Sequence, residues 1–387
     1  MNLGELKALM EKSNRKSLYK NLLNKFREFT EKRNIFYKEV KISDGIIPIL
    51  RIFNKDATRE PTSVKCFVAA QHNEYNGLFG ILDYLEHLNN NDEAVDQIIN
   101  RNQEVLFFPL MNPYGFLNPS PQNKSGYFLK NGTNLNRYWR RTFIEGYEAK
   151  EGDAKGHKIP DNAIILKNAL KKYWVNEEIP IFLLDFHETS LLERFPPELV
   201  NNLSKKSITY KFDHWLKEGI ILNVIKLYKI PYYRKPLFFK CSESADHTHL
   251  NLSMKQIDIV HEKLIEYICK NSGKLPFYFC YSKASEEYCK ILANAVYEQL
   301  KDILWNTYYP AFSHYFHDHG CFVKMNNASS RPNLYTLELE AQKQFYNLEY
   351  EKEKAQSDPN YYAEKLKYIN MNNNLVFESI KQMIALF

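Results

Sequence analysis

The sequence lacks the features that mark secreted and membrane proteins. Its six cysteines form no C-x-x-C pair and show no disulfide-framework spacing, which favours reduced thiols. The start of the chain is charged every few residues and has no apolar signal-peptide segment. No uncharged apolar run reaches about 18 residues, which argues against a membrane span. We therefore expect a soluble, cytoplasmic protein without a membrane partner.

Other absences argue against particular partners and reaction types. The net charge of +6 comes without a dense basic arm, so nucleic acid is not an expected partner. The chain has no glycine-rich phosphate loop, nucleophile elbow or cysteine–histidine signature, so serine or cysteine hydrolase chemistry has no support. What is present is a 387-residue chain with 44% hydrophobic residues, long enough for a large folded core.

The spacing of apolar residues predicts helical extensions around an α/β core. Residues 1–33 read as an N-terminal helical arm and residues 346–387 as a C-terminal helical extension. Residues 34–345 are predicted to form the main domain, with 190–300 largely a helical insertion. Strands are expected at 36–42, 46–53, 64–70, 105–110, 179–186 and 335–339, and helices at 76–88, 163–174, 256–269 and 285–300. In such a sheet, ligands gather at the carboxyl ends of the strands.

Metal-capable side chains lie at three of these strand ends. VAAQHNEYNG places Gln71, His72 and Glu74 after one predicted strand, DFHE places His187 at the end of another, and YTLELE carries Glu338. A zinc hydrolase needs three protein ligands, an open position for water and a carboxylate base beside that water. Glu74, His187 and Glu338 suit these roles, and either Gln71 or His72 would be the remaining ligand.

Five segments, taken in order, resemble the zinc metallocarboxypeptidases of the carboxypeptidase A type. That family has a His-x-x-Glu pair after a strand, then Asn-Pro-Asp-Gly-Phe, Gly-x-Asp-x-Asn-Arg, Asp-x-His and Thr-x-Glu. The matching segments here are AAQHNEYNG, MNPYGF, NGTNLNRYW, LLDFHE and YTLELE. The resemblance covers roughly residues 64–190 and 333–340. It implies an α/β/α sandwich with a mixed, mostly parallel sheet.

The resemblance also implies a role for each matched residue. Glu74 and His187 would be zinc ligands, and Glu338 would be the general base. Asn136 and Arg137 would form a clamp for the substrate carboxylate. Arginine suits a clamp because its planar fork binds a carboxylate through two hydrogen bonds. The implied reaction is zinc-dependent removal of a C-terminal residue from a peptide or peptide-like substrate with a free carboxylate.

The first ligand position departs from the family pattern. An ungapped match puts Gln71 there and is the favoured interpretation, whereas His72 fits only if one residue has been deleted. An amide oxygen is a weaker zinc ligand than imidazole, so Gln71 would predict a modest metal affinity.

The arginine that steadies the oxyanion in the family is also missing. Its position is Tyr127 here, and Tyr127, Lys130 or Lys124 could substitute for it. Asp185 is expected beside the ligand strand, with its side chain opposite to that of His187. The tyrosine that caps the substrate in the family is left open among Tyr308, Tyr309 and Tyr315.

Two other functions compete with the carboxypeptidase hypothesis. One is a deacylase of the aspartoacylase or succinylglutamate desuccinylase type, although the long segment between His187 and Glu338 favours a bulkier substrate. The other is a catalytically inactive relative that only binds carboxylate-ended peptides, suggested by Gln71 and the missing arginine. Arg140 and Arg141 would favour an acidic substrate tail or form a solvated face. Specificity and oligomeric state are left open.

Overall fold

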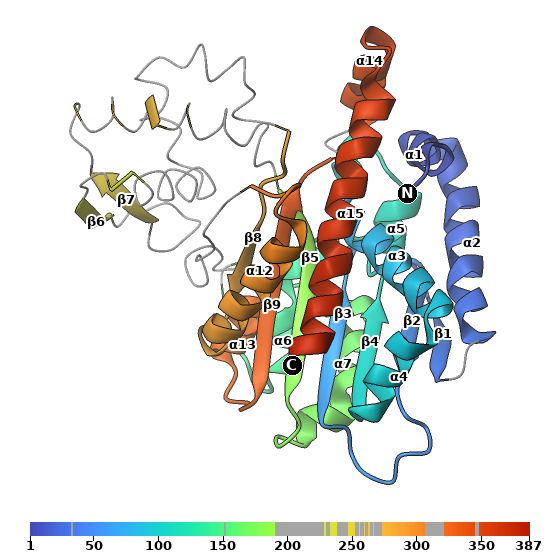
Figure 1. Cartoon of the computed structure of the whole chain (residues 1–387), viewed down its shortest axis with the longest axis vertical. Coiled ribbons are helices and arrows are strands. Elements are labelled where there is room, and N and C mark those ends of the chain that lie inside the picture. Colours follow the sequence, from blue (N-terminus) through green and yellow to red (C-terminus); the bar gives the residue numbers. More distant parts are fainter. Residues whose placement is uncertain are drawn as a thin grey trace.

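A computed structural model gives the arrangement of most of the chain. It describes residues 1–31, 34–150, 152–189, 273–305, 321–344 and 348–387, with short pieces between 228 and 266. Its centre is a seven-stranded sheet in the order β1-β2-β4-β3-β5-β9-β8 (Figure 1). The strands of this sheet are β1 (Ile35–Ile42), β2 (Gly45–Ile52), β3 (Ser63–Val68), β4 (Gln103–Phe108), β5 (Ile181–Thr189), β8 (Tyr278–Tyr281) and β9 (Leu334–Gln342).

The four central strands β4, β3, β5 and β9 run parallel, and β1, β2 and β8 pair antiparallel at the two edges. The predicted β1–β2 hairpin is confirmed, with Ile42 paired to Gly45 across the turn. Gly45 has φ +138°, and a Cβ there would lie 2.8 Å from the Cβ of Pro113. Both the backbone conformation and the space therefore require glycine.

Helices cover both faces of the sheet, which confirms the predicted α/β/α sandwich. The face seen in front in Figure 1 carries α3 (Asn76–Asn90), α4 (Asp92–Asn100), α12 (Glu286–Leu300) and α15 (Tyr361–Leu386). The opposite face carries α6 (Trp139–Phe143), α7 (Asp161–Val175) and α13 (Phe322–Ala328). Each face has its own hydrophobic cluster, one with α3, α12 and α15 and one with α6, α7 and α13. Burial of these apolar surfaces is the main stabilising contribution to the fold.

The terminal helices pack on this core. The helices α1 (Leu3–Met10) and α2 (Lys12–Glu28) contribute apolar side chains to the same cluster as α15. The guanidinium of Arg15 is buried and donates to the Leu9 carbonyl at 2.8 Å, the Tyr75 hydroxyl at 2.8 Å and the Phe116 carbonyl at 3.1 Å. Through Arg15, α2 is joined to the loop that follows β3. The division of the chain into arm, domain and extension stays a prediction.

Several elements differ from the sequence expectation. The loop predicted at MNPYGF contains a short helix, α5 (Pro113–Leu117), because Pro113 opens it and the Asn112 side chain accepts from the Gly115 N–H at 2.9 Å. The sequence reading missed α4, α6, α13 and β8. Smaller elements are β6 (Tyr233–Leu237) paired with β7 (His247–Asn251), and α14 (Leu348–Ser357). The predicted helix at 256–269 and the tyrosines 308, 309 and 315 lie mainly or wholly outside the described residues.

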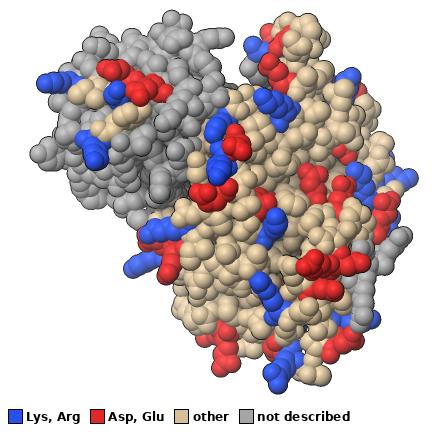
Figure 2. Space-filling view, in the orientation of Figure 1, with Lys and Arg blue, Asp and Glu red and all other residues tan. Residues whose placement is uncertain are grey.

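Two further observations concern the surface and the helices. On the face shown in Figure 2, basic and acidic side chains are interspersed rather than gathered by sign. Within the described residues, every helix is too short or too polar to cross a bilayer.

Candidate metal centre

The loop after β3 turns back across the carboxyl end of the sheet. Ala70 has φ +50°, and its carbonyl accepts from the Asn112 N–H at 3.0 Å. The Asn112 side chain also donates to the Gln71 carbonyl at 3.2 Å. This asparagine, from the MNPYGF segment, thus fixes the loop by both backbone and side chain. The following residues then project into the space above β3 and β5.

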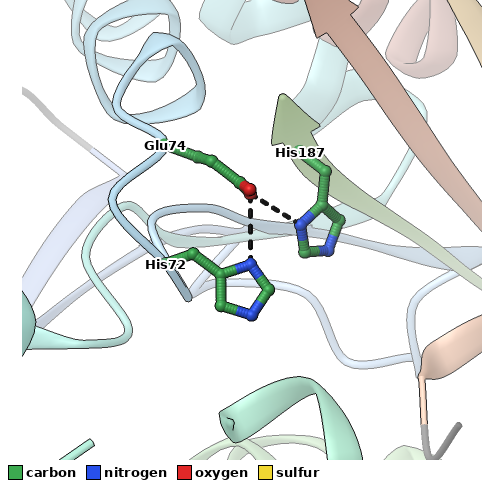
Figure 3. A group of neighbouring side chains, drawn as sticks. All are labelled: His72, Glu74 and His187. Atoms are coloured by element: carbon green, nitrogen blue, oxygen red, sulfur yellow. Dashed lines mark hydrogen bonds and ion pairs between the residues drawn. The ribbon is translucent and has the colours of Figure 1, made fainter. Parts of the chain in front are cut away.

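His72, Glu74 and His187 converge in that space, and all three are buried (Figure 3). The Glu74 Oε2 atom lies 3.2 Å from His72 Nδ1 and 2.9 Å from His187 Nδ1. The three potential ligand atoms lie within 4.8 Å of one another. Two imidazole nitrogens and one carboxylate oxygen are the donor set of a catalytic zinc site with an open fourth position. The residues present therefore fit a zinc ion.

The second nitrogen of each imidazole is held by an oxygen acceptor. His72 Nε2 lies 2.7 Å from Asn134 Oδ1, and His187 Nε2 lies 2.7 Å from Asp185 Oδ2. Because an amide oxygen and a carboxylate can only accept, each Nε2 carries a proton, and Nδ1 is the nitrogen that offers its lone pair to a metal once it has no proton of its own. Metal-binding histidines usually have such a partner behind them, which fixes the tautomer and the orientation of the ring.

The charges of the three groups are strongly linked. Burial alone would raise the pKa of Glu74, but His72 and His187 hold that pKa well below its usual range. Burial alone would lower the pKa of His187, but Asp185 and Glu74 hold it well above its usual range. Binding of a metal must therefore displace a proton from the imidazole, so metal affinity rises with pH.

Gln71 lies next to this cluster with both ends of its side-chain amide occupied. Its Nε2 donates to Asp185 Oδ2, and its Oε1 accepts from Trp139 Nε1 at 3.1 Å. Asp185 lies on the same side of β5 as His187, so the expectation that the two point to opposite faces was wrong. Residues two apart in a strand share a face. The ligand role of Gln71 stays a prediction.

The segment TNLNRYW brings the implied carboxylate clamp to the same place. Asn136 Nδ2 lies 3.4 Å from His187 Nε2, and its Oδ1 accepts from Trp139 Nε1 at 3.1 Å. Arg137 is half-buried, and its Nη1 donates to the Asn136 carbonyl at 3.0 Å. Tyr127 stacks on His72 with ring centroids 4.1 Å apart. The structure therefore places Asn136 and Tyr127 against the metal-capable cluster, with Arg137 next to Asn136.

Lys130, in contrast, is not part of this group. It lines a surface cavity of about 310 Å³ together with Asp44, Lys158 and Asp161. The ammonium of Lys124 lies 5.9 Å from the ring centroid of Tyr127 and 5.3 Å from that of Phe128. The substrate-binding role expected for Lys130 stays a prediction without support from its position.

Strand β9 carries two glutamates on the face that points to the site. Glu338 is paired in register with Asp185, and Glu340 with His187. Glu338 is almost fully buried, and its Oε1 atom has no hydrogen-bond partner among the described residues. Its carboxylate accepts from the Cys321 thiol and the Val323 N–H, and burial, opposed by His187, raises its pKa. Burial, opposed by His187 and reinforced by Glu74 and Glu338, raises the pKa of Glu340 well above its usual range.

Comparison with known proteins gives structural neighbours only. No family model matches the chain, and no curated protein matches it by sequence. Similar solved structures include a metallo-carboxypeptidase from Burkholderia cenocepacia, 10% identical, with TM-score 0.45, covering 94% of this chain and 67% of that one. Another is a metallo-carboxypeptidase from Pseudomonas aeruginosa in complex with (2-guanidinoethylmercapto)succinic acid, also 10% identical, with TM-score 0.45 and coverages of 95% and 68%.

A third neighbour is thrombin activatable fibrinolysis inhibitor, 10% identical, with TM-score 0.47, covering 96% of this chain and 74% of that one. Neighbours of this chain are thus metallocarboxypeptidases and metallopeptidases. At this level of similarity, no residue role follows from them.

The sequence reading missed three residues that contact the cluster. Asn134 caps the short helix Leu135–Arg137 and accepts from the Asn136 N–H at 2.7 Å, while it also contacts His72. Its position just before LNR is an ordinary cap signal, which says nothing of a histidine partner. Glu340 lies two residues after Glu338 in β9, so strand alternation could have indicated their shared face. Lys343 follows the end of β9, and no such pattern points to it.

Arg140 and Arg141 both contact the segment that follows α6. Arg140 is buried and pairs with Asp153 at 2.8 Å. Arg141 donates to the carbonyls of Ala154 at 2.7 Å and His157 at 2.8 Å. Both guanidinium groups thus hold the segment that follows α6. The solvated face does not apply to Arg140, which is buried, and the binding of an acidic substrate tail stays a prediction.

Proposed function

We propose that this protein is a zinc-dependent hydrolase that removes a C-terminal residue from a peptide or peptide-like substrate. The observation that carries the proposal is the cluster of His72, Glu74 and His187. In this cluster Nδ1 of each imidazole faces the carboxylate, and Nε2 of each imidazole faces an oxygen acceptor. A bound zinc ion would supply Lewis acidity, acidifying water and polarising a carbonyl. The choice of His72 over Gln71 follows from the occupied amide of Gln71.

The substrate carboxylate is proposed to bind at Arg137 and Asn136. One N–H of Arg137 donates to the neighbouring carbonyl, and the guanidinium carries further donors that could meet a carboxylate. An arginine held in place in this way binds a carboxylate with little loss of side-chain freedom. Binding of the free carboxyl group next to the metal would position the last peptide bond for hydrolysis.

A glutamate of β9 is proposed as the general base. The resemblance of the Thr-x-Glu motif favours Glu338 for this role. The potential ligand atoms of Glu338, Asp185 and His187 lie within 4.8 Å of one another. Glu340 competes for the role on position, because it is paired with His187 and is the more exposed of the two residues, at 8% against 1%. A general base must reach the water whose proton it takes.

The test is hydrolysis of a peptide panel by the zinc-loaded wild type and by E338Q and E340Q, with zinc content measured for each. We expect the variant of the true base to keep its zinc and lose about 100-fold or more in kcat. Wild-type protein without zinc, or turnover by both variants equal to that of the wild type, would refute the proposal. Turnover of N-acyl amino acids but not of peptides would support the deacylase instead. Binding of peptides without turnover would support the inactive relative.

A further inference from the structure

Lys343 brings a positive side chain to the candidate metal centre, in addition to Arg137. It follows β9 directly, and its Nζ lies 3.9 Å from Glu74 Oε1. The other oxygen of Glu74, Oε2, faces the two imidazoles. The Lys343 side chain is 15% exposed and that of Glu74 is 6% exposed, so both charged groups of this pair belong to largely buried side chains. Glu74 is the one acidic group recorded within ion-pair distance of Lys343 in the described part of the chain.

The residues expected to replace the missing arginine do not supply this charge. Tyr127 is neutral; its hydroxyl accepts from Asn134 Nδ2 at 3.1 Å, and its ring stacks on His72. Lys124 lies against aromatic rings, and Lys130 lines a separate surface cavity. Of these candidates, none brings an ammonium group to a metal-capable side chain, whereas Lys343 does.

We propose that Lys343 is the cation that binds the anionic oxygen of a ligand at the metal centre. The ligand class is a carboxylate or the oxyanion that forms when a peptide carbonyl is attacked. This inference rests on the proposed function and adds a residue to it. A positive charge in a partly buried site stabilises developing negative charge more strongly than it would in water. The flexible lysine stem allows the ammonium to move from Glu74 towards such an oxygen.

A purely structural role for Lys343 makes a different prediction. If the ammonium only orients Glu74 as a ligand, its removal should weaken zinc binding. If it serves the anion, its removal takes away a charge that repels the metal, so zinc binding should stay equal or become tighter. The two roles therefore differ in the sign of the change in zinc affinity.

The experiment compares wild type, K343M and K343R, with K290M as the control. Lys290 also pairs with one glutamate, Glu286 at 2.8 Å, but on the exposed surface of α12. Zinc affinity is measured by competition with a chromophoric chelator. Anion affinity is measured by titrating acetate into the cobalt-loaded proteins and recording the visible spectrum. We expect K343M to bind acetate about 10-fold more weakly with unchanged or tighter zinc binding, and K343R and K290M to resemble wild type.

Unchanged acetate affinity in K343M, or a loss of zinc affinity in that variant, would overturn the proposal. These measurements need no peptide hydrolysis. A wild type that binds zinc and acetate but cleaves no peptide would contradict the proposed function and leave the result for Lys343 standing. A wild type that binds no metal would contradict both.

Discussion

Replacement of His72 by alanine should remove most of the zinc affinity, whereas replacement of Gln71 by leucine should remove little. The Nδ1 atom of His72 points to Glu74 Oε2 at 3.2 Å, as a ligand would. The Gln71 amide is already bound at both ends, by Asp185 and by Trp139. To bind a metal, Gln71 would have to turn its Oε1, which is the atom that accepts from Trp139, towards the ion.

The magnitudes follow from the number of ligands and their partners. Zinc held by four ligands is worth about 10–16 kcal/mol, so one ligand accounts for about 2.5–4 kcal/mol. At about 1.4 kcal/mol per tenfold change, H72A should weaken zinc binding by roughly 100- to 1,000-fold. Groups behind a ligand are worth about 10- to 100-fold. Q71L should lie at the low end, near tenfold, because Asp185 keeps its own contact with His187 at 2.7 Å.

The assay is a competition between each protein and a chromophoric chelator for zinc, at one pH. Circular dichroism of the metal-free variants serves as the control for folding. A larger loss of zinc affinity in Q71L than in H72A would refute the assignment and restore Gln71 as the ligand. Equal small losses in both variants would show that the cluster is not the metal site.

Three further predictions concern stability, substrate and ligand orientation. Burial lowers the pKa of Lys65 to about 7, so the unfolded chain binds more protons than the folded chain between about pH 7 and 10.5. The free energy of unfolding should then rise by about 1.4 kcal/mol per pH unit in that window, and in urea titrations K65M should lose this slope; equal slopes would contradict the reasoning. R137M should raise KM for peptides about 10- to 100-fold because a charged hydrogen bond to the substrate is lost, with partial recovery in R137K; an unchanged KM would remove Arg137 from the clamp. D185N should weaken zinc binding about 10- to 100-fold, because His187 Nε2 loses its charged acceptor; unaltered affinity would contradict that role.

The fold could be predicted largely because its signals are local. The apolar runs that become β3, β4, β5 and β9 are short and bounded by turn residues, and the helices α3 and α7 show clear amphipathic spacing. The elements that were missed are short or lack such a pattern. The five-residue helix α6 and the four-residue strand β8 gain their stability from packing, which periodicity does not reveal.

The site was predictable in its parts but not in its pairings. Adjacent strand ends brought Glu74 and His187 together as expected, because parallel strands end at the same edge of the sheet. The partners behind the imidazoles, Asn134 and Asp185, depend on the register of β5 and on the path of a loop. Neither pairing can be read from one sequence. The shared face of Asp185 and His187 could have been, because residues two apart in a strand point to the same side, and the expectation of opposite faces misapplied that rule. The choice between Gln71 and His72 likewise depends on which side chain the φ +50° turn at Ala70 directs inward.

The most direct test of the central claim is the mass of the products from paired peptides. One peptide has a free C-terminal carboxylate, and the other has the same sequence with a C-terminal amide. Zinc-loaded protein is expected to remove one residue from the free-acid peptide, with little cleavage of the amide, and chelation of the metal should abolish the reaction. Equal cleavage of both peptides, internal cleavage, or activity that survives complete removal of the metal would contradict the account.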